Sequence, residues 1–316
     1  MEVILANSAG FCFGVARAVR MAEKLASSAE KPRMLGCVIH NDHVMEELVS
    51  RGMVQIDDPA QAEAGDSVLL RAHGAGRTVY EILARRGAVV VDATCPKVAR
   101  VHEIVSQADH EGRQCVMIGD PGHPEVRGVA GWCRDLLVFR GPEEVERWIA
   151  AAPEKADMPL TVVAQTTLIR EVWESSLKIL KKECTNLKIF DTICSATHIR
   201  QTEAAEIAAK VDVMVVVGDP KSANTKHLTD ICRQYCSRVF QIENADAFPR
   251  QALQGCSVAG LTAGASTPAS IIKEVKKTMS EEKIPGEGME NFAEMFEQYT
   301  NTLNTIMKAS NLKPER

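Results

Sequence analysis

The sequence has few aromatic residues, no excess of positive charge and no long hydrophobic run. Its 316 residues include only 8 Phe, 3 Trp and 3 Tyr, which disfavours binding of single-stranded nucleic acid by base stacking. Lys and Arg number 37 against 42 Asp and Glu, a net charge of −5, so no global positive field attracts a polyanion. No segment approaches the roughly 20 apolar residues that a membrane span needs. We therefore expect neither a nucleic-acid nor a membrane partner, and any anionic ligand must be held by a local site.

The sequence also lacks the features of a secreted protein. Its first residues contain no basic segment followed by an apolar one, as a signal peptide would. Ten cysteines among 316 residues are fewer than a disulfide-stabilised scaffold carries. We expect a cytoplasmic protein with reduced thiols, whose notable cysteines are catalytic or metal-binding rather than cross-linked.

Several common catalytic motifs are missing. The sequence contains no Walker A motif, no GxSxG, no HExxH and no GxGxxG after a predicted strand. Nucleotide hydrolysis, serine hydrolase chemistry and nicotinamide binding therefore have no support.

Apolar, β-branched segments alternate with amphipathic helical segments along most of the chain. The predicted strands are residues 3–5, 34–39, 67–70, 88–91, 115–118, 160–164, 187–190, 211–217 and 257–261. This alternation is typical of βαβ units with parallel sheets, in which ligands gather at the carboxyl ends of the strands. It predicts an α/β fold.

An internal repeat relates three parts of the chain. Cys12, Cys95 and Cys194 each follow a predicted strand. The residues 24 positions later are all glycines, and those 28 positions later are all polar: Gly36, Gly119 and Gly218, then His40, His123 and Ser222. A second polar loop follows in each part, at residues 72–74, 165–167 and 264–266. Repeats of this length predict three similar βα lobes with mostly parallel sheets, arranged with pseudo-threefold symmetry around a central site.

The repeat also predicts the domain boundaries. We place lobe 1 at residues 1–94, including the N-terminal strand and the Cys12 loop, lobe 2 at residues 95–193 and lobe 3 at residues 194–280. Residues 281–316 are predicted to form a linker followed by a helical tail, because glycine and proline precede apolar residues at helical spacing.

The three equivalent cysteines indicate a metal centre with an open position. Structural zinc sites usually take four protein ligands, whereas three thiolates leave one position unfilled. An iron–sulfur cluster held by three cysteines would likewise leave one iron free to bind a substrate. The alternative, three inert buried thiols, is disfavoured by their matching positions in the repeat.

The polar loops indicate an anion-binding pocket. Imidazoles can donate to phosphate oxygens and can carry charge near neutral pH, while hydroxyl and amide groups add neutral donors. The helix N-termini that follow such loops add backbone N–H groups. The candidate residues are His40, His73, His123, Ser222, Asn224 and Ser266. The alternative is a set of unrelated surface side chains.

Glu125 begins a predicted helix directly after Gly122-His123-Pro124. A carboxylate there can simply complement the helix dipole. Beside a centre with an open metal position it is also a candidate proton donor, and the spacing alone favours neither role.

At these residues the sequence resembles the 4-hydroxy-3-methylbut-2-enyl diphosphate reductases, the last enzymes of the methylerythritol phosphate route to isoprenoids. The resemblance covers roughly residues 1–280. The matching segments are Gly10-Phe11-Cys12-Phe13-Gly14-Val15, Val38-Ile39-His40-Asn41, Ala72-His73-Gly74, Asp92-Ala93-Thr94-Cys95-Pro96, Gly122-His123-Pro124-Glu125, Gln165-Thr166-Thr167, Asp191-Thr192-Ile193-Cys194, Ser222-Ala223-Asn224 and Thr262-Ala263-Gly264-Ala265-Ser266.

The resemblance implies a function and a set of residue roles. It implies a [4Fe–4S] cluster on Cys12, Cys95 and Cys194, and reductive removal of the substrate hydroxyl to give isopentenyl and dimethylallyl diphosphate. It further implies a ferredoxin or flavodoxin as the electron donor. Proton delivery would fall to Glu125, with Thr166 positioning the hydroxyl and His123 linking proton delivery to diphosphate binding. The implied diphosphate ligands are His40, His73, His123, Ser222, Asn224 and Ser266, with Thr197 as a further polar residue near the cluster.

Two positions depart from the family pattern, and two other functions stay open. Ser195 stands where many relatives have Tyr, and Ala223 replaces a hydroxyl residue often found beside Ser222. A three-cysteine cluster dehydratase of the quinolinate synthase type is one alternative, although the loops at residues 122–125 and 165–167 favour the reductase. A non-enzymatic iron–sulfur sensor that binds nucleic acid is another, opposed by the net charge and the scarcity of aromatics.

Overall fold

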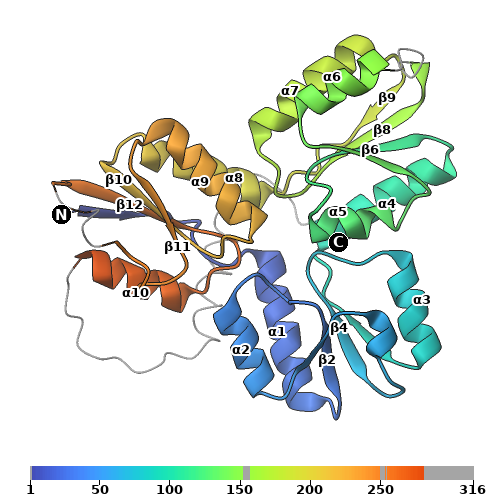
Figure 1. The fold of residues 1–316 in the computed structure, drawn as a ribbon, viewed down its shortest axis with the longest axis horizontal. Coiled ribbons are helices and arrows are strands. Elements are labelled where there is room, and N and C mark those ends of the chain that lie inside the picture. The colour runs from blue at the N-terminus through green and yellow to red at the C-terminus, as the bar shows by residue number, and fades with distance from the viewer. Residues whose placement is uncertain (1, 152–156, 250–252, 254, 281–316) are drawn as a thin grey trace, which may run out of the picture.

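The chain forms three α/β lobes around a common centre (Figure 1). The structure is a computed structural model that describes residues 2–151, 157–249, 253 and 255–280. The predicted linker and helical tail at residues 281–316 lie outside the described residues. Each lobe contains one four-stranded sheet, and every strand pairing in the three sheets is parallel.

The first lobe is a sheet covered by helices on both faces. Its elements are α1 (Phe13–Ser28), β2 (Pro32–Leu35), α2 (Asp42–Ser50), β3 (Val54–Ile56), a short 3₁₀ helix η1 (Pro59–Gln61), β4 (Ser67–Leu70), α3 (Arg77–Arg86) and β5 (Val89–Asp92). The strand order is β3-β2-β4-β5. Helices α1 and α2 pack on one face, and α3 packs on the other.

The second lobe repeats this arrangement. Its elements are α4 (Pro96–His110), β6 (Gln114–Ile118), α5 (Pro124–Ala130), β7 (Leu136–Phe139), α6 (Pro142–Ala151), β8 (Leu160–Ala164), α7 (Arg170–Glu183) and β9 (Leu187–Ile189). The strand order is β7-β6-β8-β9. Every residue of β8 is buried, as expected for a central strand covered by α4 and α5 on one face and by α6 and α7 on the other.

The third lobe combines both ends of the described chain. Its elements are α8 (Ser195–Ala208), β10 (Val213–Val217), α9 (Ala223–Tyr235), β11 (Val239–Ile242), β12 (Val258–Ala263), α10 (Ala269–Ser280) and β1 (Glu2–Leu5). The strand order is β1-β12-β10-β11. Helices α8 and α9 pack on one face and α10 packs on the other.

The position of β1 corrects one detail of the predicted domains. The N-terminal strand was assigned to lobe 1, but β1 pairs with β12 in the sheet of lobe 3 (Figure 1). The physical reason is that β1 covers the edge of β12, which would otherwise expose unpaired backbone N–H and C=O groups. β1 thus takes the sheet position that β5 and β9 hold in the other lobes.

This arrangement explains where the three cysteines lie. Each fourth strand, β5, β9 or β1, ends at the centre of the molecule and leads into the first helix of the next lobe. Cys95 lies between β5 and α4, Cys194 between β9 and α8, and Cys12 between β1 and α1. Every cysteine therefore occupies a junction between two lobes.

Three strands were not predicted, and they occupy the same place in each lobe. β3, β7 and β11 form the outer edge of each sheet, next to β2, β6 and β10. They are short, and most of their residues are only partly buried or exposed. Edge strands of this kind carry a weak hydrophobic pattern because one side has no neighbour.

Trp132 joins lobes 1 and 2. Its indole N–H donates to the Ala75 carbonyl at 2.8 Å, and its ring stacks on that of His102 with centroids 5.0 Å apart. At this contact the glycine backbones of the two lobes touch, since a Cβ added at Gly131 would lie 2.5 Å from the Gly76 Cα. Lobe 2 therefore packs directly on the loop that carries His73.

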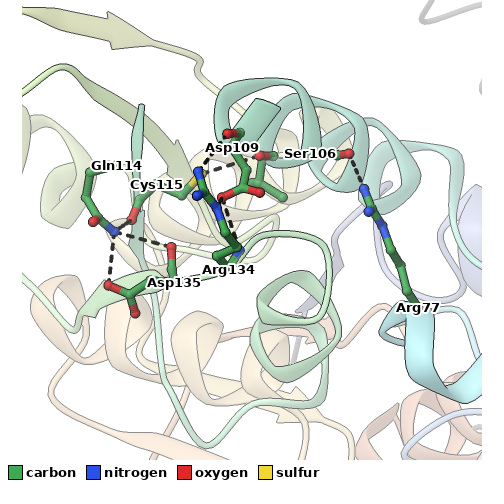
Figure 2. A network of polar contacts seen from close by, with 8 residues as sticks. Arg77, Ser106, Asp109, Gln114, Cys115, Arg134 and Asp135 are labelled. Carbon is green, nitrogen blue, oxygen red and sulfur yellow. Dashed lines mark hydrogen bonds and ion pairs between the residues drawn. The ribbon is translucent and has the colours of Figure 1, made fainter. Parts of the chain in front are cut away.

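Polar contacts support the same boundary (Figure 2). Arg77 of α3 donates to the Ser106 hydroxyl of α4, and its guanidinium lies 5.1 Å from the Trp132 ring centroid. The segment after Trp132 is held in turn by Arg134, which bonds the Asp109 carboxylate at 3.0 Å. The lobe boundary is thus fixed by hydrogen bonds as well as by packing.

In the part of the chain that the structure describes, no helix has the length and apolar character needed to cross a membrane.

Candidate active site

The three cysteines occupy equivalent positions at helix N-termini. Cys12, Cys95 and Cys194 are the N-cap residues of α1, α4 and α8, all with extended backbone. A helix N-terminus leaves backbone N–H groups without partners inside the helix. The Val15 N–H donates to the Cys12 sulfur at 3.4 Å. Burial raises the pKa of Cys95 and Cys194, and first-turn N–H groups of α4 and α8 partly oppose this rise. Each sulfur therefore lies beside a backbone N–H group that can donate to it.

The thiols also face one another across the lobe junctions. A Cβ added at Gly14 would lie 2.6 Å from the Cys95 sulfur and 3.9 Å from the Cys12 sulfur, so only glycine fits between them. Burial, followed by the neighbouring Cys12 and Cys194 thiols, raises the pKa of Cys95 to about 12. Burial and the Cys12 thiol also raise the pKa of Cys194. Such thiols ionise together only if a cation compensates them.

This donor set suits an iron–sulfur cluster. Clusters are held by cysteine thiolates and tuned by hydrogen bonds to the sulfurs. Among the described residues, no three Cys, His, Asp or Glu side chains converge as the ligands of one metal ion. A tetrahedral zinc ion would hold its thiolates about 3.8 Å apart, given a Zn–S distance of about 2.3 Å. An iron–sulfur cluster is larger than a single metal ion, so its cysteine ligands lie farther apart than those of zinc. The arrangement of these three thiols is therefore compatible with a cluster.

Three histidine rings form a row that crosses from lobe 1 to lobe 2. The His40 and His73 centroids are 5.4 Å apart, as are those of His73 and His123. Burial lowers the pKa of all three, that of His123 to about 4 and that of His73 well below its ordinary value. The packing of the lobes removes these imidazoles from water and so favours their neutral forms, in which they can still donate to a phosphate oxygen.

His123 is held in one orientation by α5. It is the N-cap residue of that helix, and its Nδ1 accepts the Glu125 N–H at 3.2 Å. In the neutral ring Nδ1 is therefore the acceptor, and the proton lies on Nε2. The free Nε2–H group is a neutral donor available to a ligand.

Glu125 and Thr166 form a buried pair within lobe 2. The Thr166 N–H donates to one Glu125 carboxylate oxygen at 2.7 Å, and its hydroxyl donates to the other at 2.6 Å. Both side chains are buried. Burial raises the pKa of Glu125 to about 7, against the lowering effect of the two bonds from Thr166. This carboxyl group can therefore release a proton near neutral pH.

Lobe 3 contributes buried polar groups without partners. The Ser222 hydroxyl caps α9 by accepting the Thr225 N–H at 3.4 Å. The Asn224 amide nitrogen and the Ser266 hydroxyl, both buried, have no hydrogen-bond partner among the described residues. Buried polar atoms are rarely left unpaired in proteins, so these two groups are suited to a polar ligand.

Two residues that support the site were not singled out from the sequence. The His227 Nδ1 on α9 donates to the Thr167 carbonyl at 2.6 Å and ties lobe 3 to lobe 2. Gln165 accepts the Asp120 N–H and donates to the Thr167 hydroxyl, each at 2.9 Å. Gln165 belongs to a quoted motif, whereas His227 lies inside a helix and carries no sequence signal.

The remaining candidate positions lie close to the centre. Thr197 is buried in the first turn of α8, where its N–H donates to the Cys194 carbonyl at 2.9 Å. Ser195 is the exposed first residue of the same helix. Ala223 begins α9 between Ser222 and Asn224.

Comparison with known proteins agrees with this arrangement. The family model described as LytB protein matches residues 3–280. The chain belongs to the LytB family. A relative named 4-hydroxy-3-methylbut-2-enyl diphosphate reductase from Caldanaerobacter subterraneus subsp. tengcongensis is 40% identical over 280 residues, 87% of this chain and 95% of that one. A relative of the same name from Geobacter sp. (strain M21) is 38% identical over 276 residues, 87% of this chain and 95% of that one.

Solved LytB structures have the same fold. One, of (E)-4-hydroxy-3-methyl-but-2-enyl diphosphate reductase, is 34% identical, with a TM-score of 0.65 over 89% of this chain and 100% of the other. The E-1-hydroxy-2-methyl-but-2-enyl-4-diphosphate reductase from Plasmodium falciparum is 26% identical, with a TM-score of 0.83 over 95% of this chain and 99% of the other. The predicted α/β fold and the predicted family resemblance are therefore confirmed.

Proposed function

We propose that this chain reduces 4-hydroxy-3-methylbut-2-enyl diphosphate to isopentenyl and dimethylallyl diphosphate. The reaction breaks the bond between carbon and the hydroxyl oxygen, consumes two electrons and two protons, and releases water. The observation that carries the proposal is the direct link between the cysteine junction and the buried acid in a LytB chain. The Cys194 N–H donates to the Thr166 carbonyl at 3.0 Å, and the Thr166 hydroxyl donates to the Glu125 carboxylate at 2.6 Å.

Cys12, Cys95 and Cys194 would hold a [4Fe–4S] cluster at the junction of the lobes. When bound, this cofactor supplies electrons that no amino-acid side chain can deliver, and it retains one iron without a protein ligand. The helix N-termini support the assignment, because their backbone N–H groups stabilise negative sulfur.

The polar loops would bind the diphosphate. His40, His73 and His123 would act as neutral donors, since burial lowers the pKa of each. Ser222, Asn224 and Ser266 would complete the set. The unpaired Asn224 and Ser266 groups support this role, because a phosphate oxygen would satisfy both.

Glu125 would deliver protons, and Thr166 would position the substrate hydroxyl. With a pKa of about 7, Glu125 is partly protonated at neutral pH and can act as a general acid. The Thr166 hydroxyl lies 2.6 Å from the carboxylate, so a group bonded to Thr166 is also within reach of Glu125. His123 would link the two functions, because it donates towards the ligand while accepting the Glu125 N–H.

An external one-electron carrier, a ferredoxin or flavodoxin, completes the proposal. Such a carrier would supply the two electrons that the reaction consumes, because amino-acid side chains cannot deliver them. A cytoplasmic location is part of the same proposal, because thiolate ligands need a compartment that keeps cysteines reduced.

Anaerobic purification followed by iron and sulfide analysis tests the cofactor. Turnover of 4-hydroxy-3-methylbut-2-enyl diphosphate with a chemical reductant, followed by identification of both products, tests the reaction. About four irons and four sulfides per chain with conversion to isopentenyl and dimethylallyl diphosphate are expected. Iron without turnover of this substrate would contradict the proposed reaction.

A further inference from the structure

The proposed diphosphate site contains little positive charge. Burial lowers the pKa of its three histidines and so favours their neutral rings. Arg71 is a fixed cation close to them, since its charge also lowers the pKa of all three. The partners from lobe 3 are hydroxyl and amide groups, which carry no charge. A diphosphate carries at least two negative charges, so fixed cations near the site must draw it in. The inference below rests on the proposed function, because it takes the anion to be the substrate's diphosphate.

A cavity of about 260 Å³ between lobes 2 and 3 contains such cations. Its lobe 2 wall includes His123 and Gln165, and its lobe 3 wall includes Lys221, Ala223 and Lys226. The cavity therefore shares His123 with the candidate active site and reaches the first residue of α9.

Arg140 is the third cation of this cavity, but it is already partnered. Its guanidinium lies 3.3 Å from the Glu144 carboxylate and 4.0 Å from that of Asp120. Within the described residues, neither Lys221 nor Lys226 forms an ion pair. The two lysines are thus the cations whose charge is available to an incoming anion.

Lys221 is also close to lobe 1. Burial is the main cause of the lowered pKa of His40, and the positive charges of Arg71 and then Lys221 add to it. The Lys221 N–H donates to the Asp219 carboxylate at 2.6 Å, which holds the loop before α9 in place. Lys221 therefore lies where the cavity between lobes 2 and 3 approaches the row of histidines.

We propose that this cavity is the route by which the diphosphate reaches the active site, and that Lys221 and Lys226 draw it in electrostatically. The cavity is lined by three cations and one carboxylate, Asp120, which lies 4.0 Å from Arg140. A cleft in which positive charge predominates raises the local concentration of an anionic ligand. The protein as a whole carries −5 and repels the substrate at long range, so the local positive cluster matters more here than on a basic protein. The neutral donors then hold the diphosphate once it has arrived.

The test replaces both lysines by glutamine in the cluster-loaded enzyme. For K221Q/K226Q we expect kcat/KM to fall about tenfold at low ionic strength, within the range known for electrostatic steering. We expect kcat to stay within about twofold, because neither lysine contacts Glu125 or Thr166. The steep loss of kcat/KM with added salt in the wild type should become shallow in the variant.

The matched control removes the same charge elsewhere. Lys210 and Lys276 are exposed and lie outside the cavity, so K210Q/K276Q should keep the wild-type kcat/KM and salt dependence. An equal loss in both double variants would show a general charge effect and overturn the proposal. Wild-type kcat/KM and salt dependence in K221Q/K226Q would overturn it as well.

Calorimetric titration with inorganic pyrophosphate provides a readout that does not depend on turnover. Weaker, less salt-sensitive binding to K221Q/K226Q than to the control supports the cavity as an anion route. If the wild type binds pyrophosphate in this lysine-dependent way but does not reduce the allylic diphosphate, the proposed function fails while the route stands. If the wild type turns over the substrate but K221Q/K226Q changes neither kcat/KM nor pyrophosphate affinity, the proposed route is wrong while the proposed function stands.

Discussion

The three cysteines and the polar loops both follow the threefold repeat of the chain, but the repeat places identical residues in the first region and different residues in the second. At the thiols, each lobe junction supplies the same residue in the same local structure, a cysteine at a helix N-cap. At the loops, equivalent positions hold His40 in lobe 1, His123 in lobe 2 and Ser222 in lobe 3. A symmetric centre thus lies beside an asymmetric pocket.

The difference follows from what each region would have to bind. A cluster presents equivalent corners, so three identical ligands at three related positions suit it. A small organic diphosphate has two chemically different ends and needs different groups around it. Lobe 2 accordingly holds the acid pair of Glu125 and Thr166, whereas lobe 3 presents the unpaired Asn224 and Ser266.

The largest effect is expected from replacing one of the three equivalent cysteines. Cys95→Ser should lose both the cluster and turnover, because an alcohol does not replace a thiolate on iron. The loss should exceed the roughly 10- to 100-fold cost of altering a group that only supports a metal ligand. Iron and sulfide analysis and a turnover assay after anaerobic purification measure both effects.

Cys133→Ser is the matched control for this variant, since Cys133 is also partly buried but lies after α5 and is not one of the three N-cap cysteines. It should keep its iron and most of its turnover. Retention of the cluster in the Cys95 variant would remove this residue from the ligand set.

The asymmetric region predicts a different result at Glu125. Glu125→Gln keeps the shape of the side chain but removes the proton, so turnover should fall by roughly 10² to 10⁴, the usual contribution of a general acid. Cluster content and pyrophosphate affinity should stay near those of the wild type. Unchanged turnover would show that protons arrive by another path.

The same variant should change the pH dependence of stability. In the unfolded chain Glu125 ionises near its ordinary pKa of 4.5, whereas in the folded protein its pKa is about 7. The free energy of unfolding should therefore decline as pH rises from about 4.5 to about 7 and level off above. Denaturant titrations over this range should show a weaker decline for Glu125→Gln than for the wild type.

Much of the fold could be predicted because its central strands are strongly patterned. β8 and β10 are buried along their whole length, and both were found from their apolar runs. The edge strands β3, β7 and β11 were not predicted, because a half-exposed strand has a weak hydrophobic pattern. The pairing of β1 with β12 was not predicted, because the order of segments in the sequence does not show which sheet an N-terminal strand joins.

For the site, the repeat predicted which loops meet, but not the state of the residues in them. The three histidines were predicted to line an anion pocket, but the sequence did not show that burial lowers the pKa of each and favours the neutral ring. This effect depends on packing between segments far apart in sequence, so no local pattern encodes it. The same holds for His227, whose bond to the Thr167 carbonyl exists only once lobes 2 and 3 are packed together.

A smaller effect is expected where lobe 3 contributes neutral donors. Ser266→Ala should raise KM roughly 10- to 100-fold, because a hydrogen bond to a charged group is worth about 1.5–3 kcal/mol. The variant should not lose stability, since the Ser266 hydroxyl is buried without a partner in the free protein. Thermal unfolding should therefore give an equal or slightly higher Tm, whereas a marked drop would mean that this hydroxyl has a structural partner.

The smallest effect is expected from removing one of the two hydrogen bonds between Thr166 and Glu125. This variant tests whether the asymmetric region sets the pKa of its acid. In the wild type the hydrogen bond from the Thr166 hydroxyl lowers the pKa of Glu125. Thr166→Val removes this bond but keeps the bond from the backbone N–H. The pKa of Glu125 should therefore rise above about 7 in the variant. Because the protonated acid is the active form, the fall in turnover with rising pH should move to higher pH, alongside a loss of roughly tenfold or more at the optimum. Thr166→Ser retains the hydroxyl and should restore the wild-type profile, so an identical profile in the valine variant would separate Thr166 from the ionisation of Glu125.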